Sequence, residues 1–478
     1  MKKSIIKNYI FNLTYQILSI ILPLVTTPYL SRVLGAETIG IYGYTISIVT
    51  YFILFGSLGV SMYGQREIAY VQDNKKNRSK VFLEIFLLKC ITLPISMLVF
   101  YITFCIKGEY QIYYKILLLY IIANIIDISW FFQGIEEFGK TVVRNIVVKI
   151  FSLLLIFICI KNENDLWKYL LIFSGSEILG NITMWMYLPK YIIKVNVKEL
   201  KIWKHMIPTI SLFIPQIATQ IYTVLDKTMV GAITKDMNEV GFYEQAQKIV
   251  KTALTIVTAF GTVMAPRIAN CFANDKKDEI VSNIKKSFTF VGIVSMPIVF
   301  GIIGISKNFV PWFYGEGFEK VTTLIIVTSP IIIAIGLSNI TGLQLLVPIG
   351  RQKEYTISVT IGAISNLILN IFFIKTMQSV GAAIASVISE IVVFAIQYYY
   401  IKDIIKLEKI IKIFLKYCLC GIVMLVVLLI MERNMKISII NTIIQIIIGA
   451  VVYFVMLFVI KDKFLIENFN VFKRGKNK

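Results

Sequence analysis

Charged residues are scarce in this sequence and histidine is almost absent. Asp, Glu, Lys and Arg together make up 16% of the 478 residues, and His205 is the single histidine. So small a charged fraction is not typical of a water-soluble globular protein. With one histidine and six scattered cysteines, the sequence predicts neither a metal centre nor the disulfide framework of a small secreted protein.

Nucleotide-binding motifs and long loops are also lacking. No Walker A sequence and no Gly-rich dinucleotide loop occurs, so the chain is not expected to hydrolyse ATP or to bind a cofactor. An enzyme acting on a large substrate usually needs a folded domain or a long loop to build its site, and the polar connections here span at most about 20 residues. We therefore expect a protein that is not an enzyme.

Apolar residues, in contrast, are abundant. They make up 57% of the chain, and the mean hydropathy is +0.76. A helix needs about 20 mostly apolar residues to cross the hydrocarbon core, and about fourteen such runs follow one another. They predict an all-α polytopic membrane protein with spans at 9–31, 39–63, 81–105, 112–133, 141–160, 166–189, 206–233, 240–264, 284–305, 320–347, 355–374, 380–401, 412–431 and 437–460.

Lysine and arginine are distributed unevenly between the two sides of the expected membrane. With the N-terminus in the cytoplasm, the cytoplasmic connections hold about two thirds of the 49 basic residues, which is the excess expected on that side. We therefore expect an even number of spans with both termini in the cytoplasm. The net charge of +21 is then explained by topology and anionic lipid headgroups, and binding to nucleic acid is not expected.

The two halves of the chain resemble each other weakly. The tripeptide GIY at 40–42 recurs as GFY at 241–243, and Arg66 recurs as Arg267 at the same displacement. Because an even number of spans separates equivalent elements, the repeat predicts two six-helix lobes in parallel orientation. The expected division is 1–200, 201–403, and a remainder of two extra helices with a basic cytoplasmic tail at 404–478.

Proline pairs mark the first helix of each expected lobe. Pro23 and Pro28 in the first span correspond to Pro208 and Pro215 in the seventh. A proline removes a backbone hydrogen bond from a helix, so these four residues are candidate gating hinges. The alternative is that they reflect only the general frequency of proline in membrane helices.

Five charged residues fall inside the seventh and eighth expected spans. A rise of 1.5 Å per residue places Asp226, Lys227, Lys248 and Lys251 in one layer, roughly 10 to 16 Å below the outer surface. Glu244, Lys248 and Lys251 also share one helical face. Charges at this depth are costly unless paired or hydrated. The excess of lysine therefore predicts a hydrated cationic cavity for an anionic substrate.

A second charged layer is expected nearer the cytoplasm. Asp127 and Lys149 lie roughly 10 to 12 Å deep, and Lys89 lies at a similar depth. Asp127 and Lys149 either form an ion pair that locks two helices together or line the cavity, and Lys89 is a further cavity candidate.

Acidic residues within the membrane are candidates for coupling transport to an ion gradient. Only such groups can bind and release H⁺ or Na⁺ there, which singles out Asp127, Glu177, Asp226 and Glu390. Glu177 and Glu390 each follow a serine near the middle of equivalent spans. They could equally be packing residues that are hydrogen-bonded to neighbouring hydroxyl groups.

Five segments of the chain are similar to segments of a known family. They are PYLSRVLGAETIGIYGY (28–44), GVSMYGQREIA (59–69), DISWFFQGIEEFGKT (127–141), LDKTMVGAITKDMNEVGFYEQAQKIVK (225–251) and GTVMAPRIA (261–269). With these segments the chain resembles the Wzx-type polysaccharide flippases of the multidrug/oligosaccharidyl-lipid/polysaccharide exporter superfamily. The resemblance extends over essentially the whole chain. It implies a MATE-like architecture of two six-helix lobes around a central cavity, moving by alternating access. It also implies that Arg32, Lys227, Lys248 and Lys251 are cationic cavity residues.

The resemblance further implies the substrate and the partners. The expected substrate is an undecaprenyl-pyrophosphate-linked oligosaccharide repeat unit, moved from the inner to the outer leaflet of a bacterial cytoplasmic membrane for capsule, O-antigen or exopolysaccharide assembly. Expected partners are membrane lipids, a polysaccharide polymerase and a chain-length regulator. A multidrug or other amphiphile exporter of the same fold is the alternative, although it should have a cavity dominated by carboxylates. A glycosyltransferase would need a catalytic loop, and a scaffolding protein would have little use for buried charges.

Overall fold

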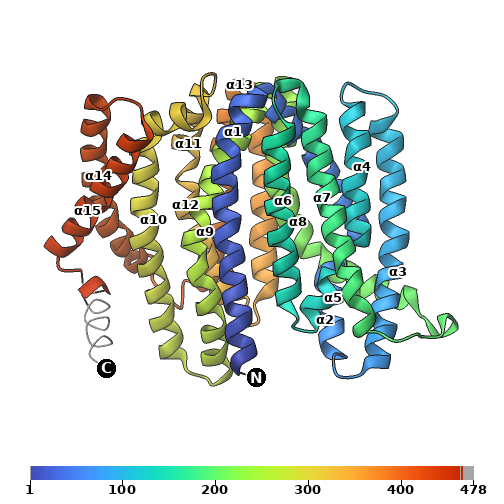
Figure 1. The fold of residues 1–478 in the computed structure, drawn as a ribbon. Helices are drawn as coiled ribbons and strands as arrows, with labels where there is room; N and C mark the ends of the chain where they lie inside the picture. Colours follow the sequence, from blue (N-terminus) through green and yellow to red (C-terminus); the bar gives the residue numbers. More distant parts are fainter. Residues whose placement is uncertain (1, 463, 467–478) are drawn as a thin grey trace. The chain divides into compact units, whose positions relative to one another are not determined.

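All regular secondary structure in the described part of the chain is helical (Figure 1). The computed structural model describes the backbone of residues 2–462 and 464–466, and their side chains except those of 2–20, 138, 197, 214–216 and 218–223. Within these residues, ten helical stretches are long and apolar enough to cross a membrane. An all-α protein with many membrane-spanning helices is therefore confirmed, whereas the number of fourteen spans stays a prediction.

Two pairs of expected spans lie within single long helices. Helix α1 (Lys2–Ser57) contains 9–31 and most of 39–63, and α13 (Gln352–Ile401) contains 355–374 and 380–401. Non-helical backbone interrupts α1 at Gly35 (φ 73°, ψ 173°) and α13 at Gln378 (φ 54°, ψ −131°). A straight helix of 50 residues would extend about 75 Å, far beyond the ~30 Å hydrocarbon core. Each long helix is therefore interrupted where one crossing would end and the next begin.

The first of two compact units contains residues 1–231 and 236–241. Within it α1 packs on α3 and α6, and α4 packs on α7 (Figure 1). The charged groups described below lie where α3, α4, α6 and α7 meet. The further elements of this unit are α2 (Val60–Tyr70), α3 (Lys75–Phe100), the π-helix η1 (Tyr101–Cys105), α4 (Gln111–Ile126), α5 (Ser129–Gly134), α6 (Phe138–Cys159), η2 (Glu163–Asp165), α7 (Leu166–Tyr187), η3 (Leu188–Lys190), η4 (Val197–Glu199), η5 (Ile202–His205) and most of α8 (Met206–Thr234).

Aromatic side chains fill the core beside α5. Phe82 of α3 stacks on Trp130 of α5 with ring centroids 5.6 Å apart, and both side chains are almost fully buried. Gly64 of α2 makes room for the indole, because a Cβ atom there would lie 2.5 Å from its Cε3 atom. This core holds the short helix α5 in place after the chain leaves α4.

The second unit contains residues 232–235 and 242–478. Its last two helices pack directly on α10, through buried Met424, Leu428 and Tyr453. The expected lobe boundaries after residues 200 and 403 concern the internal repeat and stay predictions. The elements of this unit are α9 (Met237–Ala273, apart from its first five residues), α10 (Lys277–Tyr314), α11 (Glu319–Thr328), α12 (Ile331–Asn339), the π-helix η6 (Ile340–Leu346), α13, α14 (Leu407–Asn434) and α15 (Ile439–Val459).

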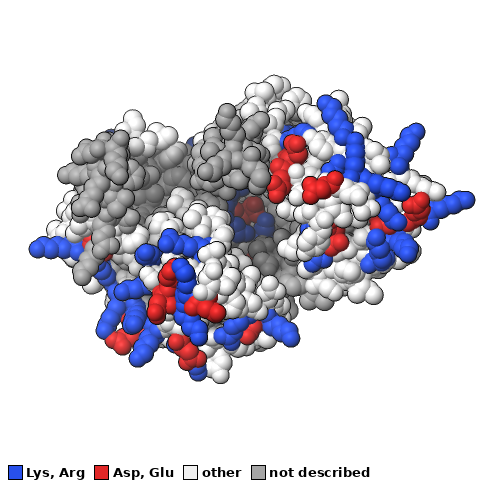
Figure 2. All heavy atoms as spheres, turned by 90° about the horizontal axis from the view of Figure 1, so that it is seen from below, with Lys and Arg blue, Asp and Glu red and all other residues white. Residues whose placement is uncertain are grey.

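Basic side chains are numerous on the face that carries the turn between α2 and α3 (Figure 2). Lys75, Lys76 and Arg78 belong to this turn and to the start of α3. The sequence assigns this turn to the cytoplasmic side, and the orientation in the membrane stays a prediction.

Candidate functional site

A break between α4 and α5 exposes polar backbone groups inside the first unit. Asp127 ends α4 with extended backbone (ψ 119°), and α5 begins two residues later. The Asp127 side chain accepts a hydrogen bond from the backbone N–H of Ser129 (2.9 Å). The backbone carbonyl oxygen of Asp127 accepts a second one from Lys89 Nζ (2.8 Å). Lys89 is only 2% exposed. Lys89 therefore connects α3 to the junction of α4 and α5. The sequence predicted that its ammonium group would lie in an open cavity, but the group is buried instead.

Arg144 of α6 is the ionic partner of Asp127. Its Nη1 atom lies 4.0 Å from Asp127 Oδ1 and donates to the side chain of Asn181 on α7. Asn181 in turn donates to the carbonyl oxygen of Ala123 on α4 (2.7 Å). Arg144 is thus one cationic partner of Asp127. The expected pairing of Asp127 with Lys149 stays a prediction.

Glu177 and Lys149 extend this group of charges. Glu177 lies one helical turn before Asn181 on α7 and interacts electrostatically with both Arg144 and Lys149. Three cations thus accompany two carboxylates where α3, α4, α6 and α7 meet. We call this group the α4–α6 polar cluster; its members are Lys89, Asp127, Arg144, Lys149, Glu177 and Asn181.

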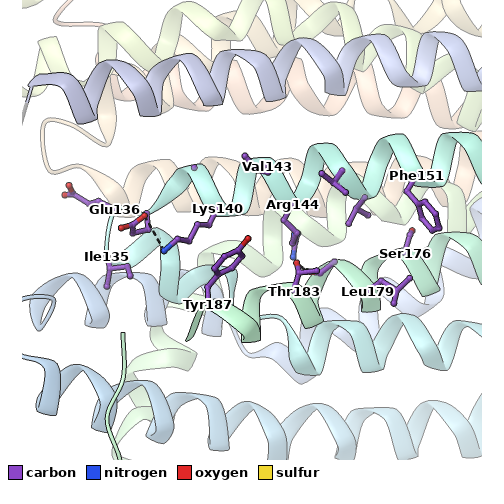
Figure 3. Close-up of a pocket in the computed structure, with 15 residues that line it drawn as sticks. Ile135, Glu136, Lys140, Val143, Arg144, Phe151, Ser176, Leu179, Thr183 and Tyr187 are labelled. Atoms are coloured by element: carbon purple, nitrogen blue, oxygen red, sulfur yellow. Dashed lines mark hydrogen bonds and ion pairs between the residues drawn. The ribbon is translucent and has the colours of Figure 1, made fainter. Parts of the chain in front are cut away.

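A groove of about 860 Å³ runs along α6 and α7 beside the cluster (Figure 3). Arg144 reaches it from the cluster, and Ser176 of α7 also lines it. At one end, Lys140 lies 3.6 Å from Glu137 Oε2 and 4.0 Å from the centre of the Tyr191 ring. The groove is therefore lined by charged side chains at one end, and Arg144 adds a further charge along its length. Its remaining wall is mainly apolar, with Val143, Val147, Val148, Phe151 and Leu179.

The residues expected in the outer layer are divided between the two units. Asp226 of α8 is buried and Lys227 is half-buried in the first unit, next to Thr228, whose hydroxyl lies 2.8 Å from Ser47 Oγ. Lys248 is half-buried and Lys251 is exposed on α9 in the second unit. Their meeting in one cationic layer stays a prediction.

Arg32 and the prolines lie on the first helix of each expected lobe. Arg32 is exposed on α1, and its Nη1 atom donates to the carbonyl oxygen of Pro28 (3.2 Å). Pro23 and Pro28 lie inside α1, whereas Pro208 is the third residue of α8, where a missing N–H breaks no helical bond. The Pro215 side chain lies outside the described residues. The interruption within α1 falls at Gly35 rather than at a proline.

Glu390 lies inside the second unit. It is 8% exposed on α13, and Ser338 Oγ of α12 lies 3.5 Å from its Oε2 atom. The π-helix η6 begins two residues after Ser338. A buried carboxyl beside a helical irregularity keeps Glu390 a candidate for ion coupling. No cluster of three or more His, Cys, Asp or Glu side chains that could hold a metal occurs among the described residues.

Two features were missed from the sequence. Arg144 is not among the cavity candidates drawn from the sequence, yet it is the central cation of the α4–α6 polar cluster. No contact of His205 was predicted from the sequence, yet its side chain is 2% exposed and bonded to Glu84 and Tyr63. The only sequence signal for either feature is a polar residue within or next to an apolar run.

Comparison with known proteins identifies two families whose members resemble this chain. The family described as "Polysaccharide biosynthesis protein" matches residues 5–272, and the family described as "Lipid II flippase MurJ" matches residues 141–449. A protein of Escherichia coli (strain K12) described as an O-antigen transporter is 23% identical over 408 residues, covering 84% of this chain and 98% of that protein.

Solved structures show the same fold. The structure of lipid II flippase MurJ in an inward closed conformation has a TM-score of 0.72 at 18% identity, covering 96% of this chain and 100% of that one. An inward-facing multidrug resistance MATE family transporter has a TM-score of 0.63 at 13% identity, with 83% and 98% coverage. The MATE-like fold is confirmed. Because the first family covers more than half of the sequence, the chain belongs to the polysaccharide biosynthesis protein family and is a Wzx-type flippase of the multidrug/oligosaccharidyl-lipid/polysaccharide exporter superfamily.

Proposed function

We propose that the protein moves an undecaprenyl-pyrophosphate-linked oligosaccharide from the inner to the outer leaflet of the bacterial cytoplasmic membrane, with both termini in the cytoplasm. The names of its relatives, an O-antigen transporter and a lipid II flippase, support a lipid-linked oligosaccharide as the substrate. The product would serve capsule, O-antigen or exopolysaccharide assembly. A polymerase and a chain-length regulator would act on it afterwards.

The observation that carries this proposal is the α4–α6 polar cluster beside its groove. Burying charges within a membrane protein is costly, and such groups usually face a substrate or an ion. Arg144 has a planar guanidinium group suited to phosphate oxygens, and it lines the groove opposite apolar side chains. A groove with polar and apolar walls suits a substrate that has a charged, hydroxylated headgroup and a hydrocarbon tail.

Transport by this protein would follow alternating access. The headgroup would enter a hydrated cavity from the inner leaflet while the polyprenyl chain remains in the bilayer. Lys227, Lys248 and Lys251 would neutralise the pyrophosphate, and bending of α1 at Gly35 and its prolines would contribute to gating. An H⁺ or Na⁺ gradient, sensed at Asp127, Glu177, Asp226 or Glu390, would give the movement its direction.

Reconstitution tests the proposal directly. Purified protein in liposomes would receive a short-chain polyprenyl-pyrophosphate oligosaccharide, and a glycan-binding probe would follow the appearance of headgroups in the opposite leaflet. Removing a charged donor to phosphate costs enough to slow translocation by about tenfold. We expect this loss in Arg144→Gln and in Lys248→Ala with Lys251→Ala, whereas Lys161→Gln, at an exposed helix end, should match the wild type.

The alternative activity gives a different result. An exporter of cationic amphiphiles would fail to move the oligosaccharide even under an imposed proton or sodium gradient, and would instead expel a cationic dye. Translocation by all variants would support the flippase activity. It would also show that Arg144, Lys248 and Lys251 have a structural role and are not needed for substrate binding.

A further inference from the structure

The connection between α7 and α8 is held against α2 and α3 along one side. Arg78 Nη2 of α3 donates to the carbonyl oxygen of Tyr191 (2.7 Å), and Ser79 Oγ accepts from the backbone N–H of Ile193 (2.9 Å). Further along, the backbone N–H of Lys201 donates to Glu84 Oε1 (2.7 Å). The connection therefore has fixed contacts at several points of its length.

A buried polar network holds the end of the connection. His205 is 2% exposed, with Nε2 2.9 Å from Glu84 Oε2 and Nδ1 2.7 Å from the hydroxyl of Tyr63. Lys204 Nζ lies 2.7 Å from the same Glu84 oxygen. Because these contacts all lie on one side, they determine which side chains point away from the unit.

The opposite side of the connection is basic and carries exposed apolar groups. Residues 188–207 contain five lysines and a single carboxylate, Glu199. Lys194, Lys198 and Lys201 are exposed, Trp203 is 63% exposed and Ile207, in the first turn of α8, is 77% exposed. Three exposed lysines are thus followed along the chain by an exposed indole and an apolar helix surface.

We propose that this side of the α7–α8 connection is a binding surface for the headgroups of anionic phospholipids. Tryptophan prefers the headgroup level of a bilayer, and clustered lysines attract anionic headgroups. The contacts to α2 and α3 present these groups already ordered, so little conformational entropy is lost on binding. The surface would secure the start of α8 to the membrane, and it does not depend on which substrate the protein carries.

Quenching of Trp203 fluorescence tests this surface in the full-length protein. The protein would be reconstituted in vesicles containing either brominated phosphatidylglycerol or brominated phosphatidylcholine at equal mole fraction. Subtracting the signal of Trp203→Phe isolates the contribution of Trp203. We expect severalfold stronger quenching by brominated phosphatidylglycerol, and loss of this preference in Lys194→Gln with Lys198→Gln and Lys201→Gln.

A matched triple variant provides the control. Lys107 and Lys161 lie in connections at the opposite end of the first unit, Lys115 lies in the second turn of α4, and all three are exposed. Replacing them with Gln should therefore leave the preference intact. Equal quenching by the two lipids, no quenching by either, or the same loss in both triple variants would overturn the proposal. Thermal melting of each variant confirms that the fold is retained.

Discussion

Gly40 of α1 and Gly241 of α9 lie against each other within the first unit. A Cβ atom on Gly40 would overlap the carbonyl oxygen of Met237, and one on Gly241 would overlap that of Ala36. These glycines begin the GIY and GFY tripeptides that the sequence repeats. The repeat therefore includes a point where the two helices approach closely, which requires residues without a side chain.

Replacing Gly241 with alanine should destabilise the protein. The added methyl group has to displace backbone, and overpacking of this kind costs about 1–3 kcal/mol. Thermal melting of the purified protein should therefore show a lower Tm for Gly241→Ala. The control is Gly175→Ala in α7, where an added Cβ meets nothing within 4 Å and alanine favours the helix by about 1 kcal/mol. An equal loss in both variants would contradict this account.

Lys89→Met should lower stability because the carbonyl oxygen of Asp127 would lose its buried donor. An unsatisfied buried polar group costs about 1–3 kcal/mol. Lys76→Met, at an exposed position on the same helix, should leave the Tm unchanged. A cavity lysine would behave differently: translocation would fall in Lys89→Met while the Tm stayed the same.

The structure around Asp127 could be predicted from the sequence only in part. Hydropathy located the apolar run 112–133, and its one carboxylate predicted a charged contact near the cytoplasm. The run is in fact two helices, α4 and α5, and their junction creates a free carbonyl oxygen for Lys89. Apolar composition is the same whether or not a helix breaks, so this contact could not be predicted.

The contacts of Arg144 and His205 were missed for a related reason. Counting residues from a helix end gives depth along the helix, but it does not give the rotation that turns Arg144 toward Asp127. Nor does it show that Glu84, 121 positions earlier in the chain, faces His205. The apolar runs were predictable from hydropathy and length, whereas these contacts depend on how distant helices pack.

The stability of the first unit should depend on pH through His205. Burial holds the pKa of the His205 imidazole below its ordinary value, although the hydrogen bond with Glu84 acts in the opposite direction. The folded state thus favours neutral His205, so this contribution is present above the ordinary histidine pKa of about 6.5 and is lost as the pH falls through the lowered value. The titratable or charged groups around the imidazole are Tyr63, Arg66, Glu67, Glu84 and Lys204.

Melting at about pH 7.5 and about pH 5 measures this dependence. The Tm of the wild type should fall more between the two pH values than the Tm of His205→Gln, because glutamine can form hydrogen bonds but does not titrate. Identical shifts in the two proteins would assign the pH dependence to other groups.

Glu390→Gln should separate ion coupling from packing. Glutamine has nearly the same size and can still accept a hydrogen bond from Ser338, so the Tm should change by no more than about 2 °C. We expect the variant to translocate substrate without the stimulation that an imposed proton gradient gives the wild type, because an amide cannot bind and release a proton there. Glu177→Gln is the comparison from the equivalent span. Since Glu177 interacts with Arg144 and Lys149, its neutralisation should lower the Tm instead. Undiminished stimulation in Glu390→Gln would leave Glu390 as a packing residue between α12 and α13.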